Sequence, residues 1–153
     1  MDTESLLKSL NAHKVRYVII GATAFPPHGY ARATQDIDIF IEPTESNALK
    51  TRQALKSFGY DILDLSLKDL LTKKVLIRQY IVETDIHPFV KGVDFKKIWR
   101  NKISDKIGST SVYFAGLEDL IRMKKAAGRA KDKEDLKILI RLKAKLNRKN
   151  NIC

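Results

Sequence analysis

The feature that most constrains this chain is the alternating stretch Asp-Ile-Asp-Ile-Phe-Ile at residues 36–41. Residues two apart in a β-strand point to the same face of the sheet, with Cα atoms about 7 Å apart. Asp36 and Asp38 therefore share one face, and the three isoleucines share the other face and are expected to pack in the core. Because carboxylates are costly to bury alone, the pair must be solvated, matched by cations or bound to a metal ion.

The surrounding pattern predicts an α+β fold: a small mixed β-sheet flanked by helices, with further helices at the C-terminus. A chain of 153 residues favours a single domain over residues 1–153, in which residues 114–150 form a helical part with a basic tail. Thr44 and Gly59 bracket one helix as its N-cap and its C-terminal signal. We expect strands at 16–20, 36–41, 75–81, 82–90 and 111–114, and helices at 3–10, 44–58, 67–71, 94–99, 117–128 and 132–146; 75–81 and 82–90 form either a hairpin or one bent strand.

Composition excludes several classes of protein. The hydrophobic fraction is 44% and the charged fraction is 31%, which is typical of a globular domain. No apolar run approaches the roughly 20 residues of a membrane span, and the first ten residues do not resemble a signal peptide. The one cysteine, Cys153, excludes an internal disulfide and a cysteine-based zinc site, so we expect a cytoplasmic protein.

The net charge of +11 indicates either a polyanionic partner, such as RNA or a nucleotide, or a solvated surface that keeps the protein dissolved. The surplus is uneven, because the chain from residue 137 onward has six Lys or Arg and no acid. This segment either contacts nucleic acid or is only a charged, solvated helix.

A divalent cation would explain Asp36 and Asp38, because two unpaired carboxylates at this spacing repel each other. Magnesium binds one or two carboxylates together with substrate phosphates, and two-metal sites stabilise both oxygens of an in-line displacement. The alternative is an exposed strand face, which is the commoner explanation of an Asp-x-Asp pair taken alone. Three further features favour a metal and nucleotide site.

The first feature is the turn Gly21-Ala22-Thr23, which directly follows the buried strand at 16–20. A glycine at a strand-to-helix turn lets backbone N–H groups approach a phosphate, and Thr23 adds a hydroxyl. A plain turn glycine is the alternative explanation.

The second feature is Asp85, which alternation places on the same strand face as Glu83 and His87. On a strand beside Asp36 and Asp38, Asp85 could serve as a third metal ligand or as a general base. A solvent-facing acidic edge explains the same pattern. His87 is expected to be structural and could orient Asp85.

The third feature is the segment 120–136, in which Lys124 could reach a phosphate as a point charge. Asp132 is equally well explained as a helix N-cap, and Arg129 with Asp135 as a structural ion pair.

Together, these residues resemble the nucleotidyltransferase fold shared with DNA polymerase β. The chain is most similar to small bacterial and archaeal nucleotidyltransferase-like proteins, including those related to abortive-infection and toxin–antitoxin nucleotidyltransferases. The motifs lie between about residues 15 and 139. They are Gly21-Ala-x-Ala24, His28-Gly29, Arg32, Thr34 and Asp36-Ile-Asp38, followed by Leu120-x-x-x-Lys124, Arg129-x-x-Asp132 and Asp135-Leu136.

The resemblance implies that a nucleotidyl group is moved from an NTP to a hydroxyl, with release of pyrophosphate. It also implies that the Gly21 turn holds the triphosphate, that Asp36 and Asp38 bind magnesium, and that Asp85 completes the catalytic and metal site. Manganese is the alternative ion. The nucleotide-binding residues are expected to be Gly21, Ala22, Thr23, Arg32, Thr34 and Lys124.

Two alternatives remain open at this stage. Arg32 and Thr34 could also be a turn residue and a local hydroxyl–backbone bond. The protein as a whole could be a catalytically inert binding protein, such as an antitoxin or an RNA-binding partner. Three carboxylates favour the enzyme, whose acceptor would be RNA, a protein or a small molecule, and whose small size suggests a homodimer or a partner protein.

Overall fold

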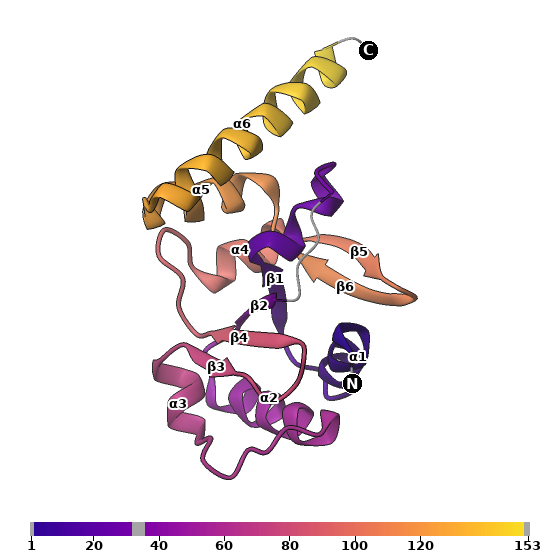
Figure 1. The fold of residues 1–153 in the computed structure, drawn as a ribbon, viewed down its shortest axis with the longest axis vertical. Coiled ribbons are helices and arrows are strands. Elements are labelled where there is room, and N and C mark those ends of the chain that lie inside the picture. Colours follow the sequence, from indigo (N-terminus) through magenta and orange to yellow (C-terminus); the bar gives the residue numbers. More distant parts are fainter. Residues whose placement is uncertain (1, 32–35, 152–153) are drawn as a thin grey trace.

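A six-stranded mixed sheet lies at the centre of the computed structural model, which describes residues 2–31 and 36–151 (Figure 1). The strands are β1 (Tyr17–Ile20), β2 (Asp36–Ile41), β3 (Val75–Ile77), β4 (Glu83–His87), β5 (Ile103–Ile107) and β6 (Thr110–Phe114), in the order β3-β4-β2-β1-β6-β5. The helices are α1 (Thr3–Ala12), α2 (Glu45–Phe58), α3 (Leu67–Thr72), α4 (Phe95–Asn101), α5 (Leu117–Ala127) and α6 (Ala130–Asn151), with short 3-10 helices η1 (Gly21–Ala24) and η2 (Pro26–His28). The predicted α+β fold with a mixed sheet and C-terminal helices is confirmed.

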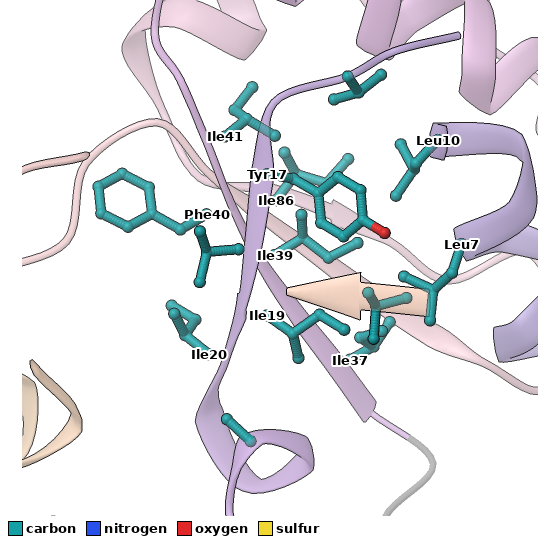
Figure 2. Close-up of a cluster of buried hydrophobic side chains, with 14 of the residues drawn as sticks. Leu7, Leu10, Tyr17, Ile19, Ile20, Ile37, Ile39, Phe40, Ile41 and Ile86 are labelled. Carbon is teal, nitrogen blue, oxygen red and sulfur yellow. The ribbon is translucent and has the colours of Figure 1, made fainter. Parts of the chain in front are cut away.

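Alternation along the central strands gives the sheet two different faces. Figure 2 shows Ile37 and Ile39 on the side of the strands that faces Leu7 and Leu10 of α1, whereas Phe40 points the other way. The side that carries the isoleucines, called the core face below, is dry because its side chains are almost fully buried. The opposite side, called the site face below, carries the polar residues of the same strands.

Helices cover both faces. In Figure 1, α1, α2 and α3 lie on one side of the sheet and α4, α5 and α6 on the other, with the C-terminal half of α6 extending past α5. On the site face, Phe95 of α4 packs edge-on against Phe40 with ring centroids 5.3 Å apart. Leu120 of α5 and Leu139 of α6 are also buried, so these two helices close over part of this face.

Strand pairing determines which polar residues meet. β2 runs antiparallel to β1 and parallel to β4, and β3 runs antiparallel to β4 at the edge of the sheet. The segments expected at 75–81 and 82–90 therefore form a hairpin, with shorter strands than predicted. None of the described helices is long and apolar enough to cross a membrane.

Candidate active site

Two aspartates from neighbouring strands face each other at the centre of the site face. Asp38 of β2 and Asp85 of β4 are direct partners in the parallel ladder, and alternation turns both side chains to the same side. Asp85 is only 15% exposed and Asp38 is 28% exposed. The prediction that Asp85 lies on a strand beside Asp38 therefore matches the geometry.

His87 completes the cluster. It lies two residues after Asp85 on the same strand face, and its Nε2 atom is 2.8 Å from Oδ1 of Asp38. The potential ligand atoms of Asp38, Asp85 and His87 all lie within 4.8 Å of one another, so together they could hold a metal ion. Sequence reasoning expected His87 to orient Asp85, but its side chain contacts Asp38 because β4 pairs directly with β2.

One oxygen of Asp85 is well suited to a metal. Its Oδ1 atom is buried and accepts no hydrogen bond from the described part of the chain. The guanidinium of Arg78 lies 2.7 Å from it, so within the chain this oxygen forms an ion pair with that cation. A buried carboxylate oxygen needs a cation or a donor beside it, and a metal ion bound here would take the place of the Arg78 guanidinium.

The turn after β1 closes over Asp38. Gly21 has a φ of +73°, and a Cβ added there would lie 2.5 Å from Oδ2 of Asp38. Glycine is therefore required twice, for the left-handed backbone and for the space that the carboxylate fills. Thr23 lies in the same turn, where its hydroxyl donates a 3.0 Å hydrogen bond to the carbonyl of Asp36 and so fixes the turn against the start of β2.

Asp36 lies apart from the three clustered side chains. It points to the same face of the sheet as they do, but it lies two residues before Asp38 on β2. It pairs with Glu83 of β4 in the ladder, and its side chain is exposed. Ala22 follows Gly21 in the 3-10 helix η1. Arg32 and Thr34, the other expected nucleotide-binding residues, lie outside the described residues.

Two cations from the edge of the sheet contact Asp85, and sequence reasoning missed both of them. Lys74 and Arg78 flank β3, two residues to either side of Leu76, which pairs with Asp85. Nζ of Lys74 lies 3.5 Å from Oδ2 of Asp85, and Nε of Arg78 lies 3.5 Å from Glu83. The ion pair with Asp85 raises the pKa of Arg78. The alternation Lys74, Leu76, Arg78 was the available signal, but it has meaning only once β3 is known to pair with β4.

Helices α5 and α6 form the opposite wall. Nζ of Lys124 lies 3.2 Å from Asp132 and 3.0 Å from Asp135, so this partly exposed lysine pairs with two carboxylates. A cavity of about 170 Å³ separates this wall from the sheet. Its lining includes Gly21, Asp38, Lys74, His87, Lys124 and Arg129. Lys124 therefore reaches the same cavity as Gly21 and Asp38.

The expected N-cap role of Asp132 is wrong, because α6 begins two residues before it, at Ala130. Asp132 instead accepts hydrogen bonds from the backbone N–H of Arg129, at 3.2 Å, and from its Nε, at 2.6 Å. Arg129 pairs with Asp132 where a pair with Asp135 was expected. The hydrogen bonds from Arg129, together with Lys124, lower the pKa of Asp132 to about 2. The ion pair between Arg129 and Asp132 therefore fixes the turn between α5 and α6, and both residues line the cavity.

Comparison with known proteins agrees with this geometry. Over residues 2–144, the chain matches the family described as nucleotidyltransferase of unknown function (DUF6036). The match spans most of the chain, so the protein belongs to this family of nucleotidyltransferases. No curated protein matches it.

Proposed function

We propose that this protein is a metal-dependent nucleotidyltransferase that moves a nucleotidyl group from an NTP to a hydroxyl of an acceptor. The observation that carries the proposal is the cluster of Asp38, Asp85 and His87, whose ligand atoms lie within 4.8 Å of one another beside a glycine turn. Family membership supports the same reaction class. We further place the chain in the DNA polymerase β superfamily, near the abortive-infection and toxin–antitoxin nucleotidyltransferases.

In this proposal, one group of residues binds the ion and the triphosphate, and Asp36 accepts a proton. Asp38, Asp85 and His87 would hold the ion, which would supply positive charge to the phosphates when bound. The Gly21 turn brings backbone N–H groups near the triphosphate, and Lys124 adds positive charge from α5. Asp36 is exposed on the same face, and we assign to it the proton of the acceptor hydroxyl.

The transfer itself is a displacement at the α-phosphorus. A bond forms between the acceptor oxygen and the α-phosphorus, and the bond from the α-phosphorus to the oxygen bridging to the β-phosphate breaks. The electron pair of that bond leaves with pyrophosphate, and the acceptor proton passes to the carboxylate of Asp36. The protein therefore acts chiefly by positioning the two oxygens and by balancing charge.

The histidine in the cluster bears on the choice of ion. Carboxylate oxygens suit both magnesium and manganese, whereas an imidazole nitrogen is a ligand of first-row transition-metal ions, to which manganese belongs and magnesium does not. Two carboxylates with one imidazole nitrogen therefore favour manganese over magnesium at this position. Magnesium remains able to bind with more of its own water.

Charge on α6 supports a nucleic-acid acceptor. From residue 137 the helix carries six Lys or Arg and no acid, and its last residues are exposed. Lys143 pairs with Glu118 at 2.7 Å, but no ion pair is described for Arg141, Lys145 or Arg148. An exposed basic helix that starts beside the cavity suits an RNA backbone better than a neutral small molecule.

The direct test is label transfer from each α-labelled NTP to RNA in the presence of manganese or magnesium. Asp38→Asn and Asp85→Asn should each reduce transfer and pyrophosphate release by about a hundredfold or more, because each removes a metal ligand. Asp105→Asn is the matched control, since Asp105 is an exposed aspartate on β5 at the far edge of the sheet. Equal activity in all three variants would contradict the assigned site, and no transfer to any acceptor by the wild type would favour the inert binding protein.

A further inference from the structure

We infer that Lys74 and Arg78 form a triphosphate-binding subsite, and that they pass from Asp85 to the phosphates of the nucleotide when the metal ion binds. This inference rests on the proposed function, because it names the residues that take the triphosphate in the same site. Neither residue belongs to the motifs that suggested a nucleotidyltransferase, and the two flank the edge strand β3.

The position of the two side chains is fixed by strand pairing. Leu76 pairs with Asp85, and residues two apart on a strand point to the same face, so Lys74 and Arg78 flank Asp85 on the site face. β3 ends the order of strands in the sheet, so these cations face solvent on their outer side. Lys74 also lines the cavity together with Gly21 and Asp38.

Lys74 and Arg78 both pair with the carboxylate of Asp85 while their own side chains stay partly in solvent. Nζ of Lys74 lies 3.5 Å from Oδ2 of Asp85, and Nη1 of Arg78 lies 2.7 Å from Oδ1. The side chains of Lys74 and Arg78 are also 51% and 42% exposed, and ion pairs at that exposure are readily broken.

Asp85 cannot bind a metal ion and keep its ion pairs with Lys74 and Arg78 without repulsion between the cations. An ion bound to its carboxylate would face the positive charge of Lys74 a few ångströms away, and like charges at that distance repel. The repulsion disappears when an anion enters between them. A triphosphate supplies that anion, with Lys74 acting as a point charge and Arg78 as a planar donor.

Loss of the Lys74 charge should change the affinities for the metal ion and for the triphosphate in opposite directions. Without nucleotide, Lys74 competes with the metal ion for Asp85, so Lys74→Gln should tighten manganese binding roughly tenfold. With manganese present, the same variant should bind inorganic tripolyphosphate roughly tenfold more weakly, because one phosphate partner is gone. Metal and triphosphate therefore assist each other in the wild type, and this mutual assistance shrinks in the variant.

The experiment is calorimetric titration of the wild type and variants, first with manganese chloride and then with tripolyphosphate at saturating manganese. Lys73→Gln is the matched control, because it removes the same charge one residue away, from a lysine that pairs with Asp69 at 3.3 Å. Its two affinities should stay within about twofold of the wild type. Arg78→Gln should weaken tripolyphosphate binding and Arg78→Lys should restore part of it.

Two outcomes would overturn the inference. One is unchanged tripolyphosphate binding in Lys74→Gln, and the other is weaker manganese binding in a variant whose circular dichroism and melting temperature match the wild type. Because only binding is measured, the result does not depend on turnover. Absence of nucleotidyl transfer would count against the proposed reaction, and an unaffected tripolyphosphate affinity would count against the subsite.

Discussion

Replacing Gly21 with alanine should disable the metal site at a moderate cost in stability. The residue has a φ of +73°, which an L-amino acid adopts at a cost of about 1–2 kcal/mol. The new Cβ would also lie 2.5 Å from Oδ2 of Asp38, where ordinary contact begins at 3.4 Å, so the carboxylate must move by about 0.9 Å. Turning Asp38 away from its rotamer adds about 1 kcal/mol, which gives about 2–3 kcal/mol in all.

The displaced carboxylate is a ligand of the proposed ion, so binding should fall more than stability does. Asp38 would lose both its place under the turn and its 2.8 Å contact with His87. We expect manganese affinity to drop by about 10- to 100-fold, as for loss of a group that orients a metal ligand. Urea unfolding gives the change in the free energy of unfolding, and calorimetric titration gives the change in affinity.

The variant Gly29→Ala separates the effect of backbone strain from the effect of displacing a metal ligand. Gly29 has a φ of +100°, but the nearest atom to its added Cβ is Cδ2 of Leu142, at 3.9 Å. This variant should therefore lose about 1–2 kcal/mol of stability through backbone strain alone and bind manganese as the wild type does. Equal manganese affinity in Gly21→Ala and Gly29→Ala would refute the claim that the turn shapes the metal site.

Two further expectations concern the α5–α6 unit. Because the folded pKa of Asp132 is about 2, below its ordinary value of 3.8, its contribution to stability is present above about pH 4 and is lost as the pH falls toward 2. Urea unfolding of Asp132→Asn should show a loss of about 2 kcal/mol at pH 7, with the two proteins converging near pH 2; a constant difference across this range would contradict the assignment. Leu139 is fully buried, so Leu139→Ala should cost about 2–5 kcal/mol, whereas Leu146→Ala, at a residue that is 43% exposed, should change stability by no more than about 0.5 kcal/mol. Similar losses in both leucine variants would mean that the second half of α6 packs in solution.

Local sequence signals predicted the helices and strands whose ends are marked by nearby residues, such as caps, or by their own alternation. The alternation at residues 36–41 gave β2 as observed, and Thr44 and Gly59 cap α2 as expected. β5 was not predicted, because its middle residues, Ser104, Asp105 and Lys106, are all polar and exposed. That strand exists because it pairs with β6, and such pairing is not visible in a strand's own composition.

The candidate site was only partly predictable for the same reason. Asp38 and Asp85 could be proposed from alternation along each strand. His87 and the two cations beside β3 acquire their places from the order β3-β4-β2, which short-range patterns do not specify. The start of α6 was misplaced because an aspartate at the third helical position can accept from the N-cap backbone, and this resembles a cap in the sequence.

The position of the bound ion tests the proposed site most directly. Crystals grown with manganese chloride should give one strong anomalous peak between the carboxylates of Asp38 and Asp85 and the imidazole of His87. The peak should vanish in Asp38→Asn crystals and persist in Asp105→Asn crystals. A fully occupied manganese ion elsewhere, with these three side chains still holding only one another and their neighbouring cations, would contradict the metal-dependent mechanism.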